Sequence, residues 1–354
     1  MSEATAMQSD ARLVDVLPQH RFSEASLWTY LQPRLPEFQH PATLRQFQGG
    51  QSNPTFLIET PIAKFVLRKK PPGKLLPSAH QIEREYRILT SLPREQIPLP
   101  SVRLFCDDAT IIGTPFYVMD YMEGRVISHP TLPQLSPEER SLVYANLARL
   151  AARLHSVDFR ACGLQDFGKP DHYVERQLDR WTRQYLASKT DDNADMIELM
   201  AWLDAHRPER EQTSIVHGDF RVGNTILHST EPRIVALLDW ELATLGHPLA
   251  DLAYACMSYH MPARSDARGG LQGLDLAALG IPTEQQFLDI YAAASGREIH
   301  DWRFFLAFSC FRMAAITQGV YARALQGNAA DGRGLEYGDT ARYFAAIGWQ
   351  VAQQ

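Results

Sequence analysis

Patterns typical of β-strands occupy the first third of this chain, and patterns typical of α-helices follow them. Before Gly124, short apolar or alternating runs are separated by turns rich in glycine and proline, which favours an antiparallel sheet. Beyond Gly124, apolar residues recur with helical spacing. The predicted strands are 44–47, 55–59, 64–68, 102–105 and 116–119, and the predicted helices are 81–89, 137–155, 173–187, 196–206, 248–259, 284–294 and 302–325.

A chain that forms strands first and helices afterwards is expected to fold into two lobes. We therefore predict an α+β fold in which an antiparallel sheet lobe precedes a larger helical lobe. Residues 1–20 are expected to be a flexible N-terminal segment, 21–122 the sheet lobe with one important helix, and 123–354 the helical lobe.

The segment from His217 to Asn224 has the spacing H-x-D-x-x-x-x-N, which is typical of the catalytic loop of kinase-type phosphotransferases. Such a reaction needs a carboxylate that accepts the proton of the attacking hydroxyl, and an oxygen ligand for Mg²⁺ nearby. Asp219 and Asn224 meet these two needs. The apolar run 234–238 then predicts a short buried strand that delivers Asp239, where such enzymes keep their main metal-binding aspartate.

The turn from Gly49 to Asn53 lies between two predicted strands of a hairpin. Its glycines allow backbone N–H groups to approach phosphate oxygens closely, so Gly49, Gly50, Ser52 and Asn53 are predicted to bind a nucleotide. A plain hairpin turn explains the same residues. The chain contains no Walker A loop, because G-x-x-x-x-G-K-[ST] is absent.

The predicted strand 64–68 should place a cation over the nucleotide phosphates, paired with a carboxylate from the helix that follows. Arg68 is nearest the end of the strand, although Lys69 stays open as the working cation. Glu85 is the better partner, because Glu83 points about 200° away around the helix. After the last predicted strand, Met119, Tyr121 and Met122 are candidates for contact with the adenine edge, and packing explains them equally well.

Several classes of partner and location are disfavoured by composition. A net charge of −6 argues against a general nucleic-acid binder. The four cysteines form no C-x-x-C pair, which fits reduced thiols in a cytoplasmic protein without a zinc site. The N-terminus lacks the features of a signal peptide, and no uninterrupted apolar run approaches the length of a membrane span. We therefore expect a cytoplasmic protein with no membrane or nucleic-acid partner, while the oligomeric state stays open.

From about Phe47 to Tyr254, these motifs resemble the aminoglycoside phosphotransferase and choline kinase superfamily, a relative of the protein kinases. The resemblance implies a protein-kinase-like two-lobe fold and an ATP- and Mg²⁺-dependent kinase. It assigns Asp219 as the catalytic base, Asn224 and Asp239 as Mg²⁺ ligands, and the Arg68–Glu85 pair as the group that orients the phosphates. The family often has lysine at the strand position, so Arg68 is more similar to the choline kinase branch.

The acceptor is expected to be a small molecule. Only residues 241–247 separate Asp239 from the helix predicted to begin at Pro248, which leaves little room for a peptide-docking platform. Asp251, in the first turn of that helix, is predicted to hold the catalytic loop by hydrogen bonds.

Four segments are also similar in amino-acid sequence to the phosphotransferase domains associated with acyl-CoA dehydrogenases. They are 65–73, 113–119, 239–246 and 312–323. That branch is linked to the phosphorylation of 4-hydroxyacyl-CoA thioesters, so the resemblance implies a CoA thioester as acceptor. An aminoglycoside, choline, homoserine or another small alcohol stays open. A nucleotide-binding pseudokinase is a further alternative, which the intact catalytic aspartates and asparagine disfavour.

The predicted helix from Tyr173 carries arginines and aromatics on adjoining faces, which could meet the adenine ring and phosphates of coenzyme A. An amphipathic helix that only packs, with solvated arginines, is the competing interpretation. The candidate substrate-binding residues are Tyr173, Arg176, Arg180, Trp181 and Glu241.

Overall fold

The computed structural model describes residues 12–48, 53–71, 81–264, 269–326 and 334–354. The chain separates into two compact units, and it passes between them more than once. The first unit comprises Met1–Ser128, Cys162–Leu164 and Gly223–Ala243, and the second comprises His129–Ala161, Gln165–Val222 and Thr244–Gln354.

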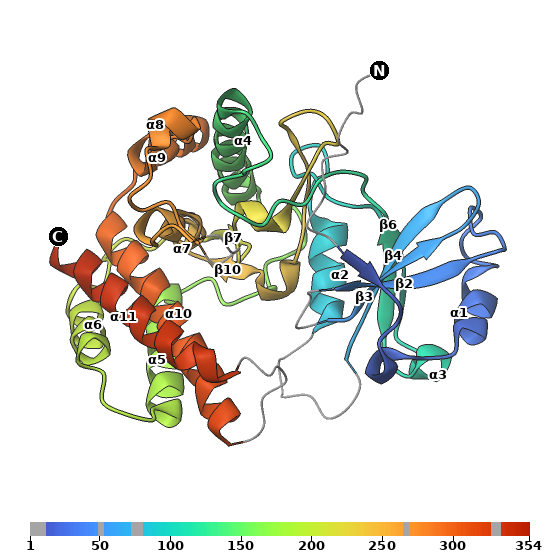
Figure 1. Ribbon diagram of the computed structural model, residues 1–354, viewed down its shortest axis with the longest axis horizontal. Coiled ribbons are helices and arrows are strands. Elements are labelled where there is room, and N and C mark those ends of the chain that lie inside the picture. Colours follow the sequence, from blue (N-terminus) through green and yellow to red (C-terminus); the bar gives the residue numbers. More distant parts are fainter. Residues whose placement is uncertain (1–11, 49–52, 72–80, 265–268, 327–333) are drawn as a thin grey trace. The chain divides into compact units, whose positions relative to one another are not determined.

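A six-stranded antiparallel sheet forms the main part of the first unit (Figure 1). Its strand order is β1-β2-β3-β4-β6-β5. The strands are β1 (Arg12–Val14), β2 (Thr43–Gln48), β3 (Thr55–Glu59), β4 (Lys64–Lys69), β5 (Val102–Cys106) and β6 (Phe116–Asp120).

The two faces of this sheet have different partners because alternate side chains of a strand point to opposite sides. Phe56, Phe65, Leu67 and Val118 belong to a core that also contains Leu27 of α1 (Glu24–Leu31). The short helix α3 (Ala109–Ile112) contributes to the same core. Helix α2 (Ile82–Ser91) packs on β5 and β6. The face of β4 that carries Arg68 is therefore available to α2.

A small hairpin, β8 (Thr225–Leu227) and β9 (Ile234–Leu237), completes the first unit. Thr225 pairs with Leu237, and the N–H of Leu238 donates to the carbonyl of Asn224 at 2.8 Å. The chain then enters the 3₁₀ turn Trp240–Leu242. This register places Asn224 and Asp239 at the same end of the hairpin.

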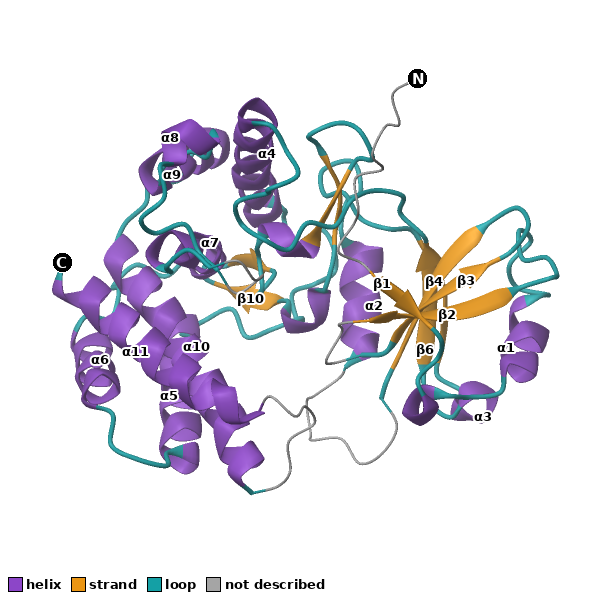
Figure 2. Ribbon diagram, viewed as in Figure 1, coloured by secondary structure: helices purple, strands orange, loops and turns teal. Residues whose placement is uncertain are grey.

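Helices dominate the second unit (Figure 2). They are α4 (Pro137–Ser156), α5 (Tyr173–Ser188), α6 (Ala194–Ala205), α7 (Pro248–Cys256), α8 (Leu276–Leu279), α9 (Glu284–Ser295), α10 (Trp302–Leu325) and α11 (Tyr337–Gln353). Helix α10 is central, since it packs against α5, α6, α7 and α11. A short antiparallel ladder joins β7 (Ser214–Val216) to β10 (Thr244–Gly246).

By length and composition alone, α10 could cross a membrane, an outcome that the absence of a long uninterrupted apolar run did not predict. The sequence expectation considered uninterrupted apolar runs, whereas α10 reaches the required mean hydropathy with polar residues interspersed. Of its most apolar window, 72% is buried inside the protein, as is usual for a core helix.

The predicted α+β class is confirmed, with a sheet of six strands in one part of the chain and helices in the other. The long predicted helices and the five predicted sheet strands are present, with ends that differ by a few residues. The sequence did not predict helix α11. It also did not predict the strands β1, β7, β8 and β10, because a strand of three residues is too short to show periodicity. Of the segment expected to be flexible, residues 1–11 lie outside the described ranges, and Arg12–Val14 pairs with β2.

Candidate active site

Arg68 is the centre of a charged cluster in the first unit. Its Nε lies 3.1 Å from Oε2 of Glu85 on α2, and its Nη2 lies 2.7 Å from Oδ1 of Asp239. Glu241 follows in the same 3₁₀ turn, with its Oε2 3.6 Å from Nη2 of Arg68. The predicted Arg68–Glu85 pair is therefore present, while Glu83 contacts Lys70 instead.

Burial controls the charges in this cluster. The side chain of Glu85 is 2% exposed, and burial raises its pKa to about 7 against the opposing effect of the Arg68 charge. The hydroxyl of Tyr117 hydrogen-bonds to Glu85 from β6. Burial by itself would lower the pKa of Arg68, but the charges of Glu85 and Asp239 raise it above its ordinary value. Arg68 is therefore a permanent cation among three carboxyl groups.

Lys69 lies on the opposite face of β4 from Arg68. Its Nζ is 5.0 Å from the centroid of the Phe22 ring, and the residue is buried. Burial lowers the pKa of this amine, because the charged form loses its hydration. Of the two cations that the sequence left open, Arg68 is the one paired with the α2 carboxylate.

Asn224 and Asp239 offer an amide and a carboxylate at the open end of the β8–β9 hairpin. No group of three or more His, Cys, Asp or Glu side chains suited to a metal occurs among the residues that the structure describes. Mg²⁺ does not need such a group, because it is commonly bound by one or two protein oxygens, waters and substrate phosphates. This donor set therefore fits Mg²⁺. Asp239 also has a left-handed backbone, with φ 67°, a conformation that aspartate adopts more readily than most non-glycine residues.

The predicted nucleotide-binding turn is only partly visible. Gly49, Gly50 and Ser52 lie outside the described residues. Asn53 is 2% exposed, and its side-chain amide has no hydrogen-bond partner among the described residues. Buried polar groups without partners are uncommon in native proteins. Within the part of the chain that the structure describes, Asn53 therefore has a donor and an acceptor that no other residue uses.

The segment proposed for adenine begins at the end of β6. Met119 is buried, whereas Tyr121 and Met122 are half-buried. The N–H of Tyr121 donates to the carbonyl of Lys64 at 3.3 Å, which fixes the start of this connector to β4. Its later backbone groups are thus held beside the sheet.

The predicted catalytic loop follows β7 in the second unit, and Asp251 fixes its first residues. The carboxylate of Asp251 accepts hydrogen bonds from the backbone N–H groups of His217 and Gly218, the latter at 2.7 Å. His155 approaches the same carboxylate at 3.4 Å. The prediction that Asp251 holds this loop is confirmed. Gly218 has φ +85°, a conformation that disfavours a side chain at this position.

The start of α7 brings Asp251 to the loop. Pro248 occupies the first turn, where its missing N–H costs nothing, and Nδ1 of His247 accepts from the N–H of Leu249 at 3.3 Å. Burial lowers the pKa of His247 to about 4, so its ring is neutral at pH 7, and it stacks on Phe305 with centroids 4.3 Å apart.

Asp219 projects from this loop and is half-buried. The hydroxyl of Tyr254 on α7 donates to its carboxylate, and Nε of Arg221 lies 3.4 Å from Oδ1. From α10, Nη2 of Arg312 donates to the carbonyl of Gly218 at 2.8 Å. Neither Tyr254 nor Arg312 has a role that the sequence motifs predict. Tyr254 only marks the end of the superfamily resemblance, and Arg312 begins the similar segment 312–323.

The candidate substrate residues on α5 differ in burial and in the groups that they contact. Trp181 is buried with the exposed Arg180 over its ring, 5.1 Å from the centroid. Arg176 donates to the carbonyl of Lys169. Tyr173 packs so closely on Gly246 that a Cβ there would lie 2.6 Å from its ring. Glu241 belongs to the first unit, beside Arg68.

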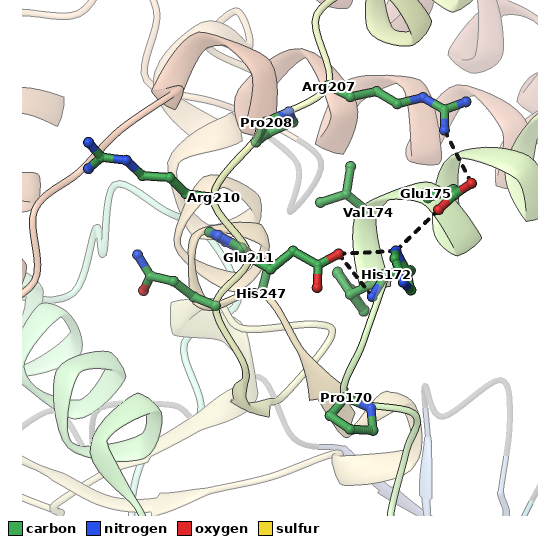
Figure 3. Close-up of a pocket in the computed structure, with 11 residues that line it drawn as sticks. Pro170, His172, Val174, Glu175, Arg207, Pro208, Arg210, Glu211 and His247 are labelled. Carbon is green, nitrogen blue, oxygen red and sulfur yellow. Dashed lines mark hydrogen bonds and ion pairs between the residues drawn. The ribbon is translucent and has the colours of Figure 1, made fainter.

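Tyr173 also lines a cavity of about 230 Å³ within the second unit (Figure 3). Figure 3 shows the carboxylate of Glu211 directed at His172, whose Nδ1 it approaches at 3.4 Å. Glu175 lies at the same distance from that nitrogen, and His247 lines the cavity as well. This mixed-charge cavity contains none of Arg180, Trp181 and Asp219.

Comparison with known proteins agrees with this geometry. Residues 43–304 match the model of the phosphotransferase enzyme family. Acyl-CoA dehydrogenase family member 10 from Mus musculus is 44% identical over 88% of this chain and 29% of its own length. The chain spans less than half of the length of the acyl-CoA dehydrogenase relatives that it matches.

Two solved structures are informative. A candidate aminoglycoside phosphotransferase from Ralstonia eutropha is 43% identical, with a TM-score of 0.85, over 94% of this chain and 99% of that chain. A complex of aminoglycoside phosphotransferase APH(4)-Ia with AMP-PNP and hygromycin B has a TM-score of 0.61 over 92% of this chain and 98% of that chain. At 16% identity, this second structure shows a common fold alone. With more than half of its length matched by the family model, the chain belongs to the phosphotransferase enzyme family.

Proposed function

We propose that this protein is an ATP- and Mg²⁺-dependent kinase that transfers the γ-phosphoryl group to a hydroxyl of a small molecule, first of all a 4-hydroxyacyl-CoA thioester. The observation that carries the proposal is Asp219, an aspartate on a loop that Asp251 fixes through two backbone hydrogen bonds. A catalytic base needs such a fixed position, because proton transfer depends on geometry first.

In the proposed reaction, a carboxylate oxygen of Asp219 accepts the proton of the acceptor hydroxyl. The acceptor oxygen forms a bond to the γ-phosphorus, and the bond from that phosphorus to the bridging oxygen of ADP breaks. The hydrogen bond from Tyr254 orients the carboxylate. Most of the acceleration comes from positioning, which can contribute ~7–11 kcal/mol for a well-oriented pair.

Asn224 and Asp239 would hold Mg²⁺, which neutralises charge on the transferring phosphoryl group. Arg68 is the proposed cation for the nucleotide phosphates, and Glu85 orients it through the 3.1 Å contact. ATP is the proposed donor because the chain belongs to this phosphotransferase family and because APH(4)-Ia, which shares its fold, binds AMP-PNP.

The thioester acceptor is supported by the acyl-CoA dehydrogenase relatives and by the charge of the described second unit. Burial and the Asp251 carboxylate raise the pKa of Tyr173. The charges of Arg176, Arg180 and Arg312 lower it, so three arginines lie near this side chain. Arginines suit the phosphates and carbonyl groups of a CoA ester. A cytoplasmic location is part of the proposal, because the four scattered cysteines form no C-x-x-C pair in the sequence, which fits reduced thiols.

A kinase screen tests this proposal. The full chain is incubated with ATP and Mg²⁺ and with 4-hydroxyacyl-CoAs, free hydroxy acids, choline, homoserine or aminoglycosides, and products are read by mass spectrometry. We expect a mass gain of one phosphate on the thioester and none with Asp219→Asn. Phosphorylation of an aminoglycoside in preference would contradict the acceptor, and nucleotide binding without transfer to any acceptor would favour a pseudokinase.

A further inference from the structure

Arg312 occupies a position in the second unit that the proposed mechanism does not use. It extends from α10 between α5 and α7, and Nη2 donates to the carbonyl of Gly218 at 2.8 Å. Its guanidinium carbon lies 5.8 Å from the ring centroid of Trp181 and 5.6 Å from that of Tyr254. Tyr254 in turn hydrogen-bonds to Asp219. One side chain thus separates the Arg312 cation from the proposed catalytic base.

The guanidinium is only partly used by the protein. A guanidinium carries five N–H donors in a planar fork. Within the described ranges, Nε of Arg312 is buried without a hydrogen-bond partner, and the Gly218 carbonyl is the one acceptor that the side chain reaches. The residue as a whole is partly exposed. Arg312 therefore has donors to offer to a bound molecule beside the loop.

The surroundings of this cation are aromatic and basic. Arg180 lies over the same Trp181 ring, and Arg221 lies beside Asp219. Asp251 and Asp219 are both engaged, since Asp251 accepts hydrogen bonds from backbone N–H groups and Asp219 accepts one from Tyr254. A positively charged acceptor would meet like charges here. An oxygen with partial or full negative charge could instead accept hydrogen bonds from the Arg312 guanidinium, which lies near the rings of Trp181 and Tyr254.

We infer that Arg312 determines acceptor specificity by binding an acyl oxygen, from a thioester carbonyl or a free carboxylate, on the same molecule as the reacting hydroxyl. This inference rests on the proposed function and deepens it. A site that supplies donors to a substrate oxygen strongly rejects analogues without that oxygen, because its donors would be left unpaired. Arg312 is thus a specificity residue as well as a contact to the loop backbone.

The simpler explanation is that Arg312 only fixes Gly218. The two roles differ in their dependence on the acceptor, because loss of a purely structural contact slows every acceptor by the same factor. Four acceptors of one carbon skeleton separate them: the 4-hydroxyacyl-CoA thioester, the free 4-hydroxy acid, the diol without a carbonyl, and the amino alcohol. kcat/KM is measured for each with the full chain, ATP and Mg²⁺.

Wild type should prefer a carbonyl-bearing acceptor over the diol and the amino alcohol. If the thioester is the better acceptor, the oxygen that Arg312 binds is a thioester carbonyl; if the free acid is the better acceptor, it is a carboxylate. Arg312→Gln should reduce the ratio of kcat/KM for that acceptor to kcat/KM for the diol by roughly 10- to 100-fold, as for loss of a charged hydrogen bond. Arg312→Lys keeps the charge without the fork and should give an intermediate ratio.

Arg303→Gln is the matched control, because Arg303 is an exposed arginine of the same helix whose guanidinium lies 5.5 Å from the Trp202 ring. It should leave the ratio unchanged. An equal loss on all four acceptors in Arg312→Gln would overturn the inference, as would a wild-type preference for the diol or the amino alcohol. If the diol is still phosphorylated when the inference fails, the proposed phosphotransferase function stands, and only the role of Arg312 in acceptor specificity is refuted.

A binding measurement covers the case in which no acceptor is phosphorylated, which would contradict the proposed function alone. Calorimetry compares butanoyl-CoA with butyl-CoA, a thioether without the carbonyl, and with butanoate. We expect wild type to bind a carbonyl-bearing compound roughly 10-fold or more tightly than the thioether, and Arg312→Gln to lose this preference. No preference in wild type, or the same preference in both proteins, would overturn the inference.

Discussion

Nη2 of Arg68 lies 2.7 Å from Oδ1 of Asp239, although 171 positions separate the two residues in the chain. The contact connects the central strand β4 to the end of the β8–β9 hairpin. Through its Nε, the same guanidinium also contacts Glu85 on α2. Three segments of the first unit therefore share one half-buried cation, and the proposed phosphate-binding cation lies beside a proposed metal ligand.

Replacement of Asp219 by asparagine tests the proposed base. Asp219→Asn keeps the size of the side chain but removes a basic oxygen. We expect turnover to fall by roughly 10²–10⁴, the range for loss of a general base, while ATP affinity is retained. Single-turnover kinetics and calorimetry with Mg·ATP measure the two quantities. Near-normal turnover would show that another group accepts the proton.

Asp239→Ala should abolish Mg²⁺-dependent nucleotide binding, because it removes the carboxylate of the proposed metal pair. Calorimetry with ATP in the presence and absence of Mg²⁺ measures this effect. Binding without Mg²⁺ should change little, which provides the internal control. Unchanged Mg·ATP affinity would remove Asp239 from the proposed metal site.

Arg68 and Lys69 provide a matched pair of adjacent cations on opposite faces of β4. Arg68→Met should lower Mg·ATP affinity by roughly 10- to 100-fold, since a charge-assisted contact to phosphate is lost. Lys69→Met should bind Mg·ATP as wild type does, because Lys69 packs over Phe22. The reverse result would make Lys69 the working cation.

The buried carboxyl of Glu85 should make stability depend on pH. Burial raises its pKa from 4.5 to about 7, so the folded protein binds more protons than the unfolded chain between these values. The free energy of unfolding should therefore fall as pH rises through this window. Glu85→Gln cannot titrate and should show a smaller fall. Urea denaturation at pH 5 and pH 8 compares the two proteins, and parallel curves would refute the assignment.

Asp251 should have the opposite dependence. Although burial alone raises its pKa, hydrogen bonds from His155 and the loop hold it below the ordinary value. Its contribution to stability should thus be complete above about pH 4 and disappear as pH falls further. Asp251→Ala leaves two buried N–H groups unpaired and should destabilise the fold by about 3 kcal/mol at pH 7. Denaturation at pH 7 and pH 3 measures both effects, and a loss independent of pH would contradict them.

Much of the fold could be predicted because strands and helices leave periodic patterns of apolar residues within short segments of the sequence. The alternation in 64–68 identified β4 and placed Arg68 apart from Lys69, and the helical spacing of 81–89 selected Glu85 over Glu83. The Arg68–Glu85 pair and the role of Asp251 in holding the loop followed from such spacing. The strands β7, β8 and β10 could not be found in this way, since three residues contain no period.

The sequence by itself determined the two kinds of structure and their order, and it predicted the chemistry of the loop from His217 to Asn224, because each depends on residues near one another in the chain. Only the tertiary structure decided that Arg312 reaches Gly218 across 94 positions and that Arg68 contacts Asp239. Such contacts arise when packing of distant elements brings side chains together. No local spacing encodes the partner, so the specificity residue proposed for the acceptor became visible only in the folded chain.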